Sequence, residues 1–90
     1  MIKIGNKYLI FFSQDTVKKY LKVPSSAKFP DRNDSTSYKV KHNSTDDSYT
    51  VTGYVESQNA LGVMLKSYYS VKMEYLPSSK QYHELQTKIE

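Results

Sequence analysis

The chain has 90 residues, with 13 lysine and arginine residues against 9 aspartate and glutamate residues, and it contains no cysteine. This length fits one small domain over residues 1–90, which buries roughly 60–65% of the surface that its unfolded chain exposes. Such a small core leaves little room for a deep, water-excluded active site. The lack of cysteine excludes disulfides and thiolate metal sites.

A short helix is the first predicted element, over residues 13–22, SQDTVKKYLK. Ser13 is a suitable N-cap, and Asp15 would lie in the first turn, where a negative charge interacts favourably with the helix dipole. Apolar residues at helical spacing predict one buried face, and Pro24 ends the helix because the residue before a proline avoids the α region. Residues 7–12, KYLIFF, suit either a backward extension of this helix or an edge strand.

Three stretches with alternating side chains follow a connector rich in proline and small polar residues. Phe29 in the connector is predicted to close one end of the core. Residues 37–42 predict a half-buried strand, and residues 49–56 and 63–75 predict two longer strands that pair as a hairpin. Gly53, inside the second strand, indicates a bulge or a close approach by the helix.

Residues 78–90 are predicted to form a short, loosely packed C-terminal helix. Pro77 ends the preceding strand, Ser78 or Ser79 can cap the helix, and apolar residues then follow at helical spacing. Together these elements predict the α+β class, with an N-terminal helix packed on an antiparallel meander of three or four strands and a short C-terminal helix.

The residues that bear chemistry favour neither catalysis nor a cofactor. His42 and His83 lie far apart in the sequence, and no local arrangement suggests a nucleophile, base and acid. Asp46 and Asp47 could join His42 around a metal, but a polar turn explains them better. The aspartates lack the spacing, central glycine and terminal glutamate of a calcium loop, and no nucleotide motif is present. We therefore expect no metal, no cofactor and no enzymatic activity.

Tyrosine is the unusual feature of the composition, since the chain has nine tyrosines and no tryptophan. Alternation places Tyr54 and Tyr68 on the mostly polar sheet face, where they could approach each other across the hairpin. Tyrosine and methionine are favoured in protein interfaces, although strand propensity alone also explains many tyrosines. The predicted partner-binding surface joins this exposed face to the hairpin tip and comprises Tyr54, Gln58, Asn59, Met64, Lys66, Tyr68 and Lys72.

The basic first third of the chain supports an alternative function, nucleic-acid binding. Residues 1–30 hold six lysines against Asp15 as the one acidic residue. The residues that would contact phosphates are Lys18, Lys19, Lys22 and Lys28. Arg32 is the only arginine, which speaks against bidentate readout, and a solvated lysine-rich surface explains the same charge.

Two segments resemble a small domain without known activity from Gram-positive bacteria and their phages. They are VKKYLKVPSSAKFP and YTVTGYVESQNALGVMLKSYYSVKMEY, and the shared pattern falls on Leu21-Lys22, on residues 24–30 and on residues 53–62. The resemblance covers roughly residues 15–75. In that family the domain stands alone in mobile elements or ends lipoproteins, and no functional residue comes with it. This chain shows no anchor or signal segment and adds residues 77–90, which favours the stand-alone form.

These observations predict a non-enzymatic protein-binding module in the cytoplasm of a bacterial host. Given the setting of the resembling family, the specific expectation is a phage or mobile-element inhibitor of a host protein, such as an anti-CRISPR or other anti-defence protein. A nucleic-acid-binding protein and an extracellular domain of an envelope lipoprotein remain alternatives. No apolar run reaches the length of a membrane span, and a homodimer through the exposed face or a strand edge is compatible with each function.

Overall fold

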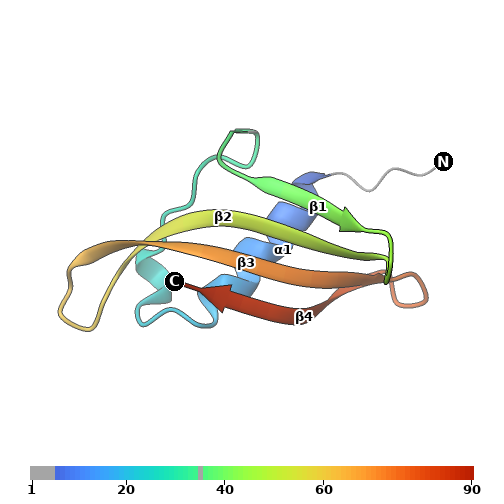
Figure 1. Cartoon of the computed structure of the whole chain (residues 1–90). Helices are drawn as coiled ribbons and strands as arrows, with labels where there is room; N and C mark the ends of the chain where they lie inside the picture. Colours follow the sequence, from blue (N-terminus) through green and yellow to red (C-terminus); the bar gives the residue numbers. More distant parts are fainter. Residues whose placement is uncertain (1–5, 35) are drawn as a thin grey trace.

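A computed structural model describes residues 6–34 and 36–90. Its elements in chain order are helix α1 (Asn6–Lys18), the 3-10 turn η1 (Pro24–Ser26), and strands β1 (Lys39–Asn43), β2 (Ser48–Gln58), β3 (Met64–Leu76) and β4 (Gln81–Ile89). The strands form one antiparallel sheet in the order β1-β2-β3-β4, and α1 crosses one face of it (Figure 1). The α+β class, the N-terminal helix and the antiparallel meander are confirmed.

Helix α1 begins earlier than predicted and includes the ambiguous segment of residues 7–12. The buried stripe of α1 starts at Leu9 and Ile10 and continues through Val17, so the segment is helical because its apolar side chains complete this stripe. Ser13 is therefore not an N-cap. It lies buried in mid-helix, where its hydroxyl donates to the Ile10 carbonyl at 2.7 Å.

The helix also ends earlier than predicted, at Lys18, and Pro24 begins η1 instead of ending α1. Proline suits the first position of such a turn because its fixed φ is already helical and its missing N–H would lack a partner there. Phe29 closes one end of the core as expected, with its ring edge-on to Tyr69 at a centroid distance of 6.3 Å.

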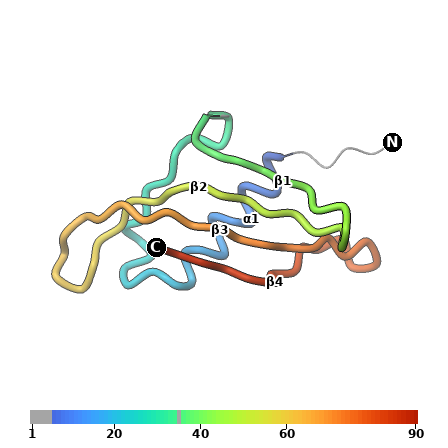
Figure 2. The backbone as a smooth tube through the Cα atoms, in the orientation of Figure 1, coloured from blue at the N-terminus to red at the C-terminus, as the bar shows by residue number. Residues whose placement is uncertain are grey.

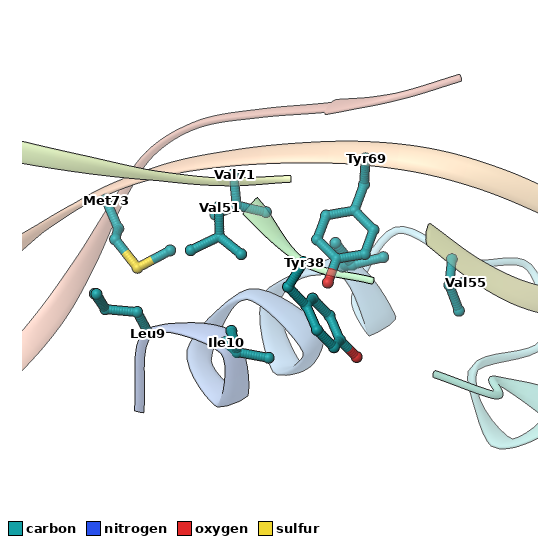
Figure 3. Packing of buried hydrophobic residues seen from close by; sticks show 9 residues of the cluster. Leu9, Ile10, Tyr38, Val51, Val55, Tyr69, Val71 and Met73 are labelled. Carbon is teal, nitrogen blue, oxygen red and sulfur yellow. The ribbon is translucent and has the colours of Figure 1, made fainter. Parts of the chain in front are cut away.

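The hydrophobic core lies between α1 and the sheet (Figure 3). Valines and Met73 from β2 and β3 meet the helix stripe, and Val51, Val71 and Met73 are completely buried. Tyr69 is the largest side chain contributed by the sheet, and its hydroxyl lies 3.3 Å from the Ser13 hydroxyl. Burial raises the pKa of Tyr69 to about 12 because the phenolate would lose its hydration.

Gly53 makes room for two tyrosine rings. A Cβ atom at this position would lie 2.9 Å from the Tyr69 hydroxyl and 3.0 Å from Cδ1 of Tyr38. The pairing of β2 with β3 runs through Gly53 without a shift. The predicted bulge is therefore wrong, and the close approach is made by the side chains of Tyr69 on β3 and of Tyr38, the residue before β1, not by the helix.

The predicted C-terminal helix over residues 78–90 is not present, because most of this segment forms β4. The helical spacing of its apolar residues also fits a strand with one irregularity. Glu84 pairs with Met73 and Gln86 with Lys72, which leaves Leu85 without a partner in the register. Tyr82 packs on Phe12 and Tyr75. The backbone of β4 pairs with the N–H and carbonyl groups at the outer edge of β3. The antiparallel pairing with β3, the preceding strand in the chain, decides the structure of the segment.

Candidate functional site

Among residues 6–34 and 36–90, no helix or strand covers the face of the sheet opposite α1 (Figure 1), and we call it the open face. Tyr54 on β2 and Tyr68 on β3 are direct partners in the register, with ring centroids 6.3 Å apart. The ammonium nitrogen of Lys66 lies 4.1 Å from the Tyr54 ring centre and 5.6 Å from that of Tyr68. We call these three residues the tyrosine–lysine cluster. Tyr68 is 61% exposed, so the cluster presents a large aromatic surface to solvent.

Four lysines of the open face lie beside this cluster in two neighbouring rows across the sheet, and we call them the lysine band. One row is Lys39, Thr52, Ser70 and Lys88, and the other is Lys41, Thr50, Lys72 and Gln86. Hydroxyl side chains lie between the lysines, so the band offers ammonium and hydroxyl donors over several strands. Such a surface can hold carboxylates or phosphates.

Lys72 differs from the other lysines of the band because it already has an acidic partner. Its ammonium lies 2.9 Å from a carboxylate oxygen of Asp46, in the turn between β1 and β2. A hydrogen bond from the Ser48 hydroxyl, followed by the contact with Lys72, holds the pKa of Asp46 well below its usual range. Within residues 6–34 and 36–90, the ammonium groups of Lys39, Lys41 and Lys88 make no ion pair.

The hairpin tip differs from the prediction. Gln58 and Met64 are paired where the β2–β3 hairpin leaves the sheet, but Asn59 is not presented to a partner. Its side-chain oxygen accepts hydrogen bonds from the backbone N–H groups of Leu61 at 2.9 Å and Val63 at 3.0 Å. Asn59 therefore holds the turn together, and the residues that the tip exposes are apolar.

Sequence reasoning missed these apolar residues. Leu61, Val63 and Leu65 are each more than half exposed, and Met64 is 39% exposed. The sequence does contain a sign of this apolar surface, the run LGVML directly after polar residues. Hairpin turns are usually polar throughout, so an apolar run at this place is unusual. The alternation predicts an ordinary strand for this run, but Leu61 and Val63 lie in the turn before β3 begins.

The lysines of the nucleic-acid alternative lie near the C-terminal end of α1 and in the following connector. Lys18 lies 6.0 Å from the Phe29 ring centre, and Lys19 contacts Glu84 at 3.4 Å. Lys22 lines a groove beside the hairpin, and the backbone of Lys28 bonds to that of Glu56. Lys22 and Lys28 therefore lie beside the hairpin, whereas Lys18 and Lys19 lie against Phe29 and β4. All four are separate from the lysine band.

A hollow of about 420 Å³ lies next to the tyrosine–lysine cluster, where β1 ends and the edge of β2 continues. Its walls include Tyr38, Lys39, Tyr54 and Tyr68. It joins the cluster to the lysine band, so the open face is indented at the junction. In the described residues no group of three histidine, aspartate or glutamate side chains could hold a metal. His42 lies 2.6 Å from Asp47 and packs beside the Tyr49 ring at a centroid distance of 4.7 Å.

No protein-family model, no curated protein and no solved structure matches the chain. The resemblance drawn from the sequence therefore stays a prediction, and a functional proposal has to be built on the geometry of the open face. Across residues 6–34 and 36–90, none of the helices has the length and apolar character that crossing a membrane requires.

Proposed function

We propose that the chain is a non-enzymatic protein-binding module whose open face holds an acidic surface of a partner protein. The tyrosine–lysine cluster is the observation that carries this proposal. The ring of Tyr68 is exposed and does not belong to the core. A tyrosine in such a position buries a large area when a partner binds, at a small cost in side-chain entropy. Lys66 lies over both rings, which orders the cluster before a partner arrives.

The charge of the open face selects the chemistry of the partner. Lys39, Lys41 and Lys88 make no ion pair within the described residues and are free to meet carboxylates. The Thr52 hydroxyl donates to the Lys39 carbonyl at 3.4 Å, and the Ser70 hydroxyl in the same row can donate a hydrogen bond to these carboxylates. An acidic protein segment with apolar side chains would satisfy the lysines and the tyrosines together.

Nucleic acid fits the same face less well. Glu56 is the register partner of Lys66, and Glu90 exchanges backbone hydrogen bonds with Tyr68, so two carboxylates flank the cluster. They would repel a phosphate backbone that tracks across the rings. The face also carries no arginine, the residue best suited to phosphate and base contacts.

A more specific form of this proposal is an inhibitor that a phage or mobile element directs against a host protein in the bacterial cytoplasm, for example an anti-CRISPR protein. Its support is the resemblance described above and the small size of the chain. A rigid sheet face of this kind can block an acidic surface without any chemistry of its own.

Photo-cross-linking tests the proposal. A benzophenone amino acid replaces Tyr68 in one version of the chain and Tyr8, which is 70% exposed on α1, in another. We expect a discrete protein adduct from a nuclease-treated bacterial lysate with the Tyr68 version and none with the Tyr8 version. Equal adducts from both positions, or adducts only with nucleic acid in an untreated lysate, would overturn it.

A further inference from the structure

The hairpin of β2 and β3 projects beyond its neighbours in the sheet (Figures 1 and 2). β1 pairs with β2 only as far as Thr52, and β4 pairs with β3 only from Tyr69 onward. Residues 57–67, which we call the arm, therefore extend past both edge strands. The arm ends in four exposed apolar side chains, the apolar tip, which comprises Leu61, Val63, Met64 and Leu65.

The apolar tip is held in one conformation. The backbone N–H of Asn59 donates to the Val63 carbonyl at 2.9 Å, and that of Gly62 donates to the Asn59 carbonyl at 3.0 Å. Gly62 has a φ of +82°, which glycine adopts without strain. With the two bonds to the Asn59 side chain, these contacts fix the direction of Leu61 and Val63. Leu61, at 86%, is the most exposed large apolar side chain described.

Lysines outnumber acidic residues around the base of the apolar tip, where Glu56 is the register partner of Lys66. The sequence from Ser57 to Met73 contains no acidic residue, and Lys66 is the only charged side chain of the arm. Lys22 lines the groove beside Leu65. Lys28 is bridged to β2 at Glu56. A strand rises about 3.3 Å per residue, so Lys66 lies roughly 7 Å behind Met64 along the arm.

We propose that the apolar tip inserts into the interfacial region of an anionic lipid bilayer. Peripheral membrane segments bury apolar side chains about 5–10 Å deep, which matches the separation between the tip and Lys66. At that depth Lys22, Lys28 and Lys66 meet the negative headgroups.

This insertion requires no partner protein and shares only Lys66 with the proposed function. The lysine band lies on the other side of the tyrosine–lysine cluster, with its two rows at Thr52 and Thr50, five and seven residues along β2 from Ser57, where the arm starts. The band therefore remains outside the bilayer when the tip is inserted. A chain held at a membrane in this way would still present its open face to a partner protein.

Sedimentation with vesicles tests the insertion. The full chain is mixed with vesicles of equal parts phosphatidylcholine and phosphatidylglycerol, or of phosphatidylcholine alone. We expect binding to the mixed vesicles, and a roughly tenfold or greater loss of partitioning for the Leu61→Ser, Val63→Ser double variant. Leu85→Ser is the matched control, because Leu85 is an exposed leucine on β4. Circular dichroism confirms that each variant is folded.

Two further readouts separate insertion from simple charge attraction. The chain has no tryptophan, so Leu61→Trp provides a single fluorophore whose emission shifts to the blue if the tip enters the bilayer, whereas Tyr8→Trp does not shift. Lys22→Gln with Lys66→Gln weakens binding more than the matched double variant Lys41→Gln with Lys88→Gln does, although each removes two positive charges. The proposal is overturned if the unmodified chain does not sediment with the mixed vesicles, if the tip variant partitions like Leu85→Ser, or if the Leu61→Trp emission stays unchanged.

Discussion

The ammonium group of Lys66 lies over the ring of Tyr54, 4.1 Å from its centre, on a sheet face that no helix or strand in the described part of the chain covers. Exposed cation–π contacts of this kind contribute about 0.5–1 kcal/mol, too little to explain why two aromatic rings and a lysine gather there for stability alone. The register places Tyr68 directly opposite Tyr54, so the cluster follows from the pairing of β2 and β3. We infer that its purpose is recognition.

Two methionines of the same strand should differ sharply in their effect on stability. Met73 is completely buried under α1, whereas Met64 lies 39% exposed on the arm. Met73→Ala is expected to lower the free energy of unfolding by about 2–5 kcal/mol, because it leaves a cavity in the core. Met64→Ala should change it by less than about 0.5 kcal/mol. Urea titration measures both, and equal effects would show that the core is placed wrongly.

Gly53→Ala should destabilise the fold without changing its surface. The added Cβ would press against the Tyr69 hydroxyl and the Tyr38 ring, and Tyr38 is held by hydrogen bonds to Gln14 and Pro30. Overpacking of this kind costs about 1–3 kcal/mol, which urea titration can measure. A variant as stable as the parent chain would contradict the close approach of the two rings.

Acid should destabilise the protein through its surface carboxylates. The pKa values of Asp34, Asp46 and Glu84 are all lowered in the folded state, mainly by hydrogen bonds from neighbouring hydroxyl groups. A carboxylate with a lowered folded pKa stabilises the fold above its unfolded pKa of about 4, and this stability is lost as the pH falls through the folded value. We therefore expect the free energy of unfolding to decrease steadily as the pH is lowered from 5 to 2.

Asp46→Asn isolates one of these carboxylates. The variant should be less stable than the parent chain at neutral pH, because the pair with Lys72 is lost, and its stability should fall less steeply in acid. Urea titrations at a series of pH values provide the comparison. Parallel curves for the two proteins would contradict the role given to Asp46.

Strand alternation in the sequence predicts β2 and β3, and with them the common face of Tyr54, Lys66 and Tyr68. Such local patterns suffice because each strand shows a period of two over many residues. The tail of residues 81–89 could not be assigned in this way, since its apolar spacing fits a helix or a strand with one unpaired residue. The backbone pairing with the outer edge of β3, which is joined to this tail by the turn at residues 77–80, decides between them.

The hairpin tip shows a second limit of sequence reasoning. Asn59 appears in a typical turn sequence, and its exposed polar side chain would be a reasonable contact for a partner. In the structure, the same side chain bonds to the N–H groups of Leu61 and Val63. Residue type alone does not tell whether a turn asparagine points to solvent or closes its own loop, so the apolar tip was not predicted.

The affinity of the cross-linked partner for purified variants tests the central claim most directly. Isothermal titration calorimetry would compare the parent chain with Tyr68→Ala and with Tyr8→Ala, both of which replace an exposed tyrosine. We predict a roughly tenfold or greater loss of affinity for Tyr68→Ala, with unchanged stability, and no loss for Tyr8→Ala. Equal affinity of the parent chain and Tyr68→Ala would show that the open face is not the binding surface.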